Sequence, residues 1–144
     1  MTLLEKQNKI VAEFQNLAHW EDRYKKIIEM GRALPDLPEN KRTEESKVKG
    51  CQSQVWLHAH LNSNNEMILE GDSDALIVKG LVALLLQIYS QSKPSDVLQT
   101  KPDFLKAIGF EGNLSPSRAN GLFAMLKQIQ MFAMAFNYKL TQKT

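Results

Sequence analysis

The stretch of sequence that decides the fold runs from residue 71 to residue 89 and reads GDSDALIVKGLVALLLQIY. Its larger part, Ala75 to Tyr89, is apolar almost all round and is interrupted only by Lys79, Gly80 and Gln87. A helix with this pattern is buried on most of its surface, so we expect it to be the central helix of the core. Gly80 costs about 1 kcal/mol relative to alanine inside a helix, and close approach of another backbone would compensate for that cost.

The four residues before this helix, Gly71 to Asp74, predict where it starts. Aspartate and serine side chains accept hydrogen bonds from the free backbone amides of a first helical turn. Asp72 and Asp74 are therefore interpreted as helix caps and partners of the helix dipole, rather than as acids or bases of a reaction.

Upstream of this stretch the pattern changes from helical to alternating. Residues 54–61 place Val55, Leu57, Ala59 and Leu61 on one face and Trp56, His58 and His60 on the other, which is typical of a strand. The sequence NSNN at 62–65 predicts a turn, and 67–70 would return as the antiparallel partner. Because an isolated hairpin is only marginally stable, we expect a third strand in the 32–50 stretch, at Ser46 to Lys49.

Helical patterns lie on both sides of this hairpin. They predict a first helix over residues 3–17, a second from Trp20 to Met30 that ends at Gly31, two short helices at 95–99 and 102–108, and a last helix capped by Ser115 with Pro116 in its first turn. The order of elements predicts an α+β fold in which helices pack on one side of a small antiparallel sheet.

Length and composition limit the class of protein. A chain of 144 residues with 43% hydrophobic residues predicts one domain over residues 1–144, because domains usually need roughly 100–200 residues. The formal net charge of +2, with bases and acids alternating between residues 41 and 49, argues against nucleic acid as a partner. No apolar run approaches the roughly 20 residues that span a bilayer, and the first residues lack a signal-peptide pattern. We therefore expect a cytoplasmic protein without a membrane partner.

Cys51 is the only cysteine, which excludes an internal disulfide and any C-x-x-C metal or redox site. A free cysteine is often a small buried hydrophobe, but Cys51 lies where a long polar loop meets the first strand, and functional residues concentrate on such loops. Nearby cations would favour its thiolate, whereas an apolar cover would raise its pKa. The residues around it are polar, basic or small: Lys47, Lys49, Gly50, Gln52 and Ser53.

A hydrolase or a zinc site at Cys51 would need histidine side chains beside the thiol, and the sequence gives little support for either. A hydrolase nucleophile requires a base, and the three candidates are His19, His58 and His60, none of which lies in a hydrolase signature. Cys51, His58 and His60 could make a three-ligand zinc site, but solvent-facing strand histidines explain the pair more simply. Arg118 is either a surface cation or a partner of a carboxylate or thiol. No phosphate-binding or dinucleotide motif is present, so no cofactor is expected.

Three segments, read together, resemble the SufE family of sulfur acceptors. They are VKGCQSQVW at 48–56, GDSDALIVKGL at 71–81 and LSPSRANGL at 114–122. The sequences WEDRY at 20–24 and LPDL at 34–37 are also similar to the N-terminal third of that family. The resemblance covers nearly the whole chain in the right order.

The resemblance implies a partner of a cysteine desulfurase of the SufS or CsdA type, and the pyridoxal phosphate belongs to that enzyme. Cys51 would accept the terminal sulfur of the desulfurase persulfide, stimulate the desulfurase, and carry the sulfur toward an iron–sulfur scaffold. The implied fold is the one shared with IscU-type scaffolds. Those proteins use several cysteines and this chain has one, so assembly of a cluster on this chain alone is not expected.

Within this implied role, Gly50, Gln52, Ser53, Asp74 and Arg118 are candidates to support the Cys51 loop or to form a docking surface. We expect residues 45–53 to move on docking, with Gly50 as one hinge. The alternative is a binding-only regulator of a desulfurase, which would not need the thiol. A thiol hydrolase that acts without a desulfurase is a third, more distant possibility.

Overall fold

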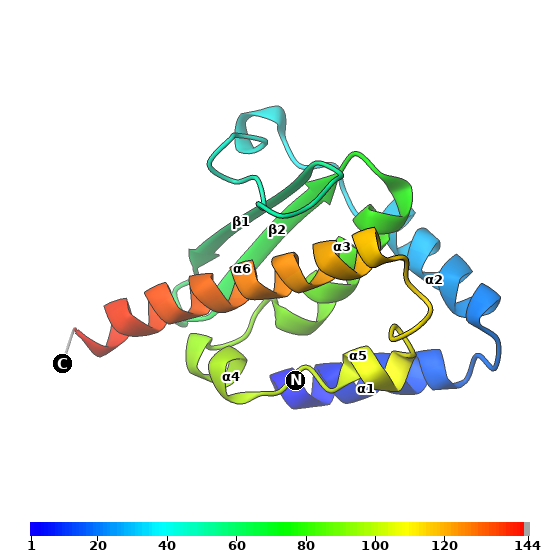
Figure 1. Cartoon of the computed structure of the whole chain (residues 1–144). Coiled ribbons are helices and arrows are strands. Elements are labelled where there is room, and N and C mark those ends of the chain that lie inside the picture. The colour runs from blue at the N-terminus through cyan, green and yellow to red at the C-terminus, as the bar shows by residue number, and fades with distance from the viewer. Residues whose placement is uncertain (143–144) are drawn as a thin grey trace.

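The structure, a computed structural model that describes residues 1–142, combines a β-hairpin with six α-helices (Figure 1). The elements in chain order are α1 (Leu3–Gln15), α2 (Trp20–Ala33), the 3-10 turn η1 (Glu39–Lys41), β1 (Val55–Leu61), β2 (Met67–Ser73), α3 (Leu76–Tyr89), α4 (Pro94–Gln99), α5 (Phe104–Ile108) and α6 (Pro116–Thr141). The α+β class predicted from the sequence is confirmed.

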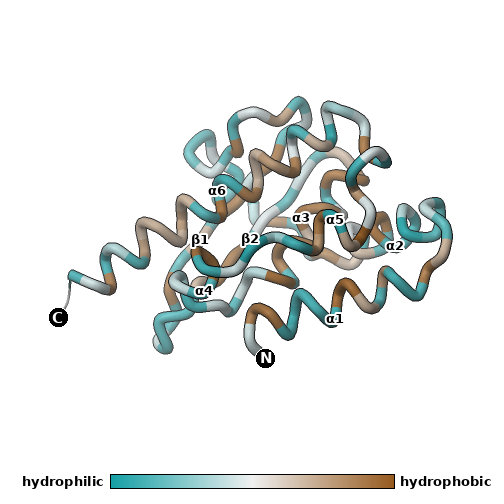
Figure 2. Tube along the Cα trace, turned by 60° about the horizontal axis from the view of Figure 1, so that its bottom comes forward, coloured by the Kyte–Doolittle hydropathy of each residue, from teal (hydrophilic) through white to brown (hydrophobic). Residues whose placement is uncertain are grey.

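Helix α3 is the central helix, as its uninterrupted apolar sequence predicts. Leu81, Leu84, Leu85 and Ile88 are completely buried, and α3 contacts α1, α2, α6 and strand β2. Figure 2 shows the same segment as the most continuously hydrophobic part of the chain. Burial of apolar surface of this extent is the main stabilising contribution to such a fold.

The packing of α2 against α3 depends on two glycines that face each other. A Cβ on Gly31 would lie 2.7 Å from the Gly80 nitrogen, and a Cβ on Gly80 would overlap the carbonyl group of Ile27. The close approach of another backbone at Gly80 is therefore confirmed. The prediction that α2 ends at Gly31 is wrong, because the helix continues to Ala33 and Gly31 serves this contact instead of a C-terminal cap.

Strands β1 and β2 pair antiparallel, with Val55 opposite Ser73 and Leu61 opposite Met67. The asparagine-rich connection forms the predicted turn. The side-chain oxygen of Asn62 accepts hydrogen bonds from the backbone amides of Asn64 and Glu66, both at 2.9 Å. Asn65 has a φ of 60°, a left-handed conformation that asparagine tolerates better than most residues.

The third strand expected at Ser46–Lys49 is reduced to a single bridge between Lys47 and Trp56. The Val48 amide donates to the Val55 carbonyl and the Leu57 amide donates to the Ser46 carbonyl, both at 2.8 Å. The pairing stops there because the chain turns away at Gly50, whose φ is +93°. Within residues 1–142 the sheet thus has two strands, stabilised by the helices below it and by this short edge contact.

The start of α3 also differs from the prediction, since Gly71, Asp72 and Ser73 belong to β2. The helix begins at Leu76, and no side chain caps it at Ala75. Asp72 does not act as a cap because its carboxylate has other partners. It accepts from the Leu37 amide at 2.9 Å and from the guanidinium of Arg42 at 2.7 Å.

The Asp72 side chain is 1% exposed, and its carboxylate connects β2 to the loop that follows α2. Burial alone would raise the pKa of Asp72, but hydrogen bonds from the Leu37 and Ser73 amides and the nearby Lys79 ammonium outweigh it and hold the pKa below the ordinary aspartate value. The Asp72 carboxylate therefore stabilises the fold at pH values above the pKa of unfolded aspartate. This contribution is lost as the pH falls through the lower pKa of the folded state.

Replacing Asp72 with asparagine is expected to lower the free energy of unfolding at pH 7 by about 2–3 kcal/mol, because hydrogen bonds to a buried charge are lost. The loss should shrink as the pH falls below the pKa of unfolded aspartate and through the lower folded pKa, where the native carboxylate also protonates. Urea unfolding measured between acidic and neutral pH tests this. The control is Asp36→Asn, which removes a 79% exposed partner of Lys79 and should change stability by less than about 1 kcal/mol. Equal losses for both variants would contradict the account.

Helix α6 begins as predicted and crosses the face of the hairpin (Figure 1). The hydroxyl of Ser115 accepts from the Arg118 amide, and Pro116 occupies the first turn. The side chains that α6 buries lie in its N-terminal two thirds: Leu122, Met125, Leu126, Ile129 and Ala133. None of the helices within residues 1–142 is long and apolar enough to span a membrane.

Candidate functional site

Cys51 lies at the tip of a short loop between residues 48 and 55 whose base is fixed by backbone hydrogen bonds. Val48 and Val55 close one side of the base. On the other side, the Gln54 amide donates to the Asp74 carboxylate at 3.0 Å, and the Asp74 amide donates to the Gln54 carbonyl at 3.2 Å. Asp74, interpreted from the sequence as a helix cap, therefore attaches the Cys51 loop to the end of β2.

The tip of the loop rests on a strip of small residues on α6. The Cys51 Sγ lies 3.7 Å from the carbonyl oxygen of Gly121, and a Cβ on Gly50 would lie 3.5 Å from the Cβ of Ala124. A thiol is a weak donor, so this contact contributes little. The hydroxyl of Ser117 donates to the side-chain oxygen of Gln52 at 2.8 Å in an exposed position. The base of the loop is thus firmly held, whereas its tip is attached by a few weak contacts.

A cavity of about 330 Å³ lies beside the partly buried Cys51. It is formed where the loop, the start of α3 and the start of α6 meet. Its lining residues are Cys51, Gln52, Ser53, Ala75, Ile77, Val78, Ser115, Ser117, Arg118, Gly121 and Met125. The structure therefore brings Cys51, Gln52, Ser53 and Arg118 together around one cavity, while Asp74 acts at the base of the loop.

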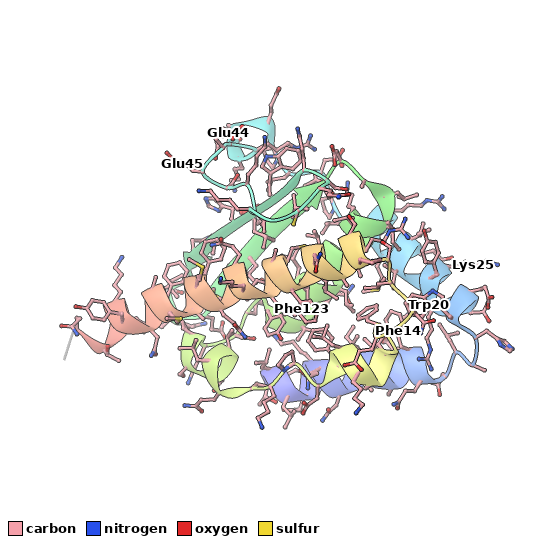
Figure 3. The ribbon with its side chains drawn as sticks, viewed as in Figure 1. Phe14, Trp20, Lys25, Glu44, Glu45 and Phe123 are labelled. Carbon is pink, nitrogen blue, oxygen red and sulfur yellow. The ribbon has the colours of Figure 1, made fainter. Side chains whose placement is uncertain are left out.

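Gly50 faces a second hollow, of about 940 Å³, on the other side of the loop. Charged residues of both signs line it, including Glu44, Glu45, Lys47, Lys49 and, on α6, Lys127. Figure 3 shows Glu44 and Glu45 projecting from the loop above the hairpin. The tip of the loop that carries Cys51 therefore lies between two hollows and rests on α6.

Burial raises the pKa of the Cys51 thiol above the ordinary cysteine value. The sequence allows two opposite effects on this thiol, and desolvation by burial is the one that shifts its pKa. Arg118 lines the cavity, but its guanidinium also stacks against Tyr24, with 5.8 Å between the guanidinium carbon and the ring centroid. In the free chain Cys51 is therefore largely a protonated thiol at neutral pH.

The raised pKa predicts a specific alkylation profile for Cys51. In the folded chain the rate of reaction with iodoacetamide should rise with pH to a midpoint above the ordinary cysteine value, because only the thiolate reacts. In urea, where burial is lost, the midpoint should return to that value. Rates of alkylation followed by intact mass over a pH series measure both midpoints. A folded midpoint below the unfolded one would show that the surrounding cations dominate over burial.

The histidines do not contribute to this site. None of the three lines the Cys51 cavity. His58 and His60 lie in β1, where their potential ligand atoms approach Glu70, and Cys51 is not part of that group. His19 precedes α2. Within residues 1–142 the structure therefore places neither a histidine base nor a histidine ligand beside Cys51, which removes the support for a histidine-assisted hydrolase and for a zinc site that includes the cysteine.

Several residues of the site are not predicted from the sequence pattern. Gly121 and Ala124 form the floor under the loop, and Ser117 binds Gln52. A glycine in the interior of a long helix is the one signal that could have identified Gly121, because glycine is unfavourable there unless something approaches closely. The role of Asp74 depends on a contact with Gln54, twenty residues away in sequence.

The family model and the curated relatives that match this chain all point to the same protein family. The model of the SufE family, described as an Fe-S metabolism associated domain, matches residues 8–133. An uncharacterized SufE-like protein of Rhizobium etli is 47% identical over 127 residues, which cover 85% of this chain and 86% of that protein. An uncharacterized SufE-like protein of Rhizobium meliloti is 44% identical over 127 residues, covering 85% and 91% of the two chains.

A solved structure has the same fold. The solution structure of a hypothetical protein from Thermus thermophilus superposes with a TM-score of 0.76 at 25% identity, and the match covers 92% of this chain and 96% of that one. The family model covers most of the chain and the relatives exceed 40% identity. These matches agree with the segments around Cys51, α3 and α6 that suggested the same family. The chain therefore belongs to the SufE family, whose domain is associated with iron–sulfur metabolism.

Proposed function

We propose that this chain accepts sulfur from a persulfide on a cysteine desulfurase, holds it on Cys51, and delivers it toward iron–sulfur cluster assembly. The observation that carries the proposal is the placement of Cys51. The only thiol of the chain lies at the tip of a loop with a firm base and a weakly attached tip, next to a cavity. Membership of a family associated with Fe-S metabolism supports the proposal.

The transfer is a thiol exchange with a simple balance. The Cys51 thiolate attacks the terminal sulfur of the desulfurase persulfide, a new sulfur–sulfur bond forms on Cys51, and the old one breaks. The desulfurase thiolate leaves with the electron pair of the broken bond and takes up a proton. A second exchange of the same kind, on a downstream scaffold, would return Cys51 to the thiol. Neither step requires a cofactor on this chain, because the pyridoxal phosphate belongs to the desulfurase.

The geometry supports transfer that depends on docking. A protonated, partly buried thiol is a poor nucleophile, so the free chain would react slowly with other electrophiles. Movement of residues 45–53 on docking, with Gly50 as a hinge, would expose Cys51 and remove the desolvation that raises its pKa. Gly50 suits this role because its φ of +93° is accessible to glycine without strain. A reducing compartment such as the cytoplasm would keep the thiol available between encounters.

Stimulation of the desulfurase tests the proposal against a binding-only regulator. Alanine release from cysteine is measured for the desulfurase alone, with the native chain and with Cys51→Ser. A sulfur carrier predicts acceleration by the native chain and none by Cys51→Ser, since the persulfide is not removed. Full acceleration by Cys51→Ser would establish the regulator instead. Consumption of a substrate by this chain in the absence of desulfurase would establish an independent enzyme.

A further inference from the structure

The face of the hairpin that points away from the helices carries a group of potential metal ligands. His58 and His60 alternate with core residues along β1, and Glu70 on β2 lies directly opposite His58. At one end of this face, Arg42 covers Trp56, with 5.4 Å between the guanidinium carbon and the ring centroid. The group of His58, His60 and Glu70 stays accessible, with the first and third partly buried and His60 exposed.

The three side chains approach one another closely enough to share an ion. One ligand atom of each lies within 4.8 Å of the other two, and the Nδ1 of His58 lies 3.9 Å from the Oε1 of Glu70. A tetrahedral zinc ion with bonds of about 2.0–2.1 Å holds its ligand atoms about 3.3–3.4 Å apart. The side chains would therefore need only small rotations, on a backbone that the β1–β2 ladder already fixes.

The Nδ1 of His58 provides a second, independent indication. It is shielded from solvent and has no hydrogen-bond partner among residues 1–142. Its separation of 3.9 Å from Glu70 is too long for a hydrogen bond. A shielded polar atom without a partner is unfavourable, because its desolvation is not compensated. An ion bound by this nitrogen would compensate that desolvation, and the Glu70 carboxylate, which accepts a hydrogen bond from Lys41, would be a second ligand.

We propose that His58, His60 and Glu70 bind one zinc ion on the outer face of the hairpin. Two imidazoles and one carboxylate are a ligand set that zinc uses, with a fourth position left for water or another ligand. Imidazole favours zinc, copper and nickel over magnesium and calcium. The site contains no residue of the Cys51 cavity, so it is separate from the sulfur-accepting role and does not depend on it.

Lys41 is the competitor of the ion. Its ammonium lies 2.8 Å from the Oε1 of Glu70, the same oxygen that faces His58. Zinc must displace this ammonium or use the other carboxylate oxygen. Removing the Lys41 charge should therefore strengthen zinc binding, which distinguishes a site built around Glu70 from unspecific binding to a histidine.

Zinc binding to the full chain without an affinity tag, measured by isothermal titration calorimetry and native mass spectrometry, tests the proposal. We expect one zinc per chain. His58→Ala, His60→Ala and Glu70→Gln should each weaken binding at least about tenfold, because loss of even an outer hydrogen-bond partner of a metal ligand costs about 10–100-fold in affinity. Lys41→Met should tighten it severalfold. His19→Ala is the matched control, because His19 is the histidine outside the group, and it should bind zinc as the native chain does.

Cys51→Ser separates this site from the sulfur site. If zinc binds through the thiol, Cys51→Ser abolishes binding and the His58 and His60 variants retain it, which overturns the proposal. Unchanged affinity in all three ligand variants also overturns it. Thermal unfolding of every variant without metal shows whether it is folded. If a histidine variant is destabilised without metal, His58→Gln or His60→Gln replaces it. If the folded replacement binds zinc as tightly as the native chain does, the proposal is also overturned.

Discussion

Replacing Gly80 with alanine is expected to lower the free energy of unfolding by about 2–3 kcal/mol. The new methyl group would overlap the carbonyl group of Ile27, and overpacking of this kind costs about 1–3 kcal/mol. We expect the upper part of that range because the obstacle is backbone, which cannot rotate away as a side chain does. Helices α2 and α3 would have to separate, and α3 is the most buried helix of the fold. Urea unfolding followed by circular dichroism measures the loss.

Gly121→Ala is the matched control for Gly80→Ala. Both glycines lie inside helices, where alanine stabilises the helix by about 1 kcal/mol relative to glycine. A Cβ on Gly121 would lie 3.7 Å from the Cys51 sulfur, an ordinary contact distance, so Gly121→Ala should be as stable as the native chain or more stable. If Gly80→Ala were equally stable, the close contact of α2 and α3 would not be what requires glycine at position 80.

Replacing Cys51 with serine is expected to abolish the uptake of sulfur completely. Serine has nearly the same shape and preserves the loop, but its hydroxyl does not form a persulfide. Because the chain has no other cysteine, no second thiol can substitute for it. After incubation with desulfurase and cysteine, persulfide labelling should detect sulfur on the native chain and none on Cys51→Ser.

The same variant should keep its affinity for the desulfurase, since Cys51 makes only weak contacts within the chain. In excess it should compete with the native chain and bring desulfurase turnover back toward the unstimulated rate. The urea midpoint of Cys51→Ser should match that of the native chain, which excludes unfolding as the cause. Sulfur found on the serine variant would contradict the role assigned to Cys51.

The sequence predicts the elements of this fold well where the determinants are local. The apolar run from Ala75 to Tyr89 predicts α3 because a helix that is apolar almost all round is buried on most of its surface. The Asn62–Asn65 turn and the Ser115 cap follow from side-chain hydrogen bonds to nearby backbone. The sequence also indicates close approach at Gly80, although the partner there, the backbone of α2 at Ile27 and Gly31, is not evident from it.

The errors occur where contacts distant in sequence decide the outcome. Asp72 has the sequence of a helix cap, but its partners Leu37 and Arg42 are 35 and 30 residues away, and they keep it in β2. Gly31 has the sequence context of a C-terminal helix cap, but it lies inside α2 and contacts α3. The third strand ends after one bridge because Gly50 turns the chain toward α6. Local preference is overridden in each case by a tertiary contact.

Of the candidate site, the sequence identifies the thiol and its loop but not the surroundings that set its reactivity. A single cysteine at the junction of a polar loop and a strand, within segments similar to the SufE family, points to Cys51. Its raised pKa depends on how far α6 and the start of α3 cover it, which requires the packed structure. The single cysteine also suits the proposed role, since a second nearby thiol would attack the carried persulfide and release the sulfur as sulfide.

The most direct test of sulfur transfer is the intact mass of both proteins in one sample, taken at intervals after cysteine is added to the desulfurase and the native chain. The proposal predicts that this chain gains one sulfur, which cysteine supplies through the desulfurase persulfide as it is converted to alanine, that alkylation of Cys51 beforehand prevents the gain, and that a reductant reverses it. A desulfurase that is accelerated by this chain while the mass of the chain never increases would contradict the proposal.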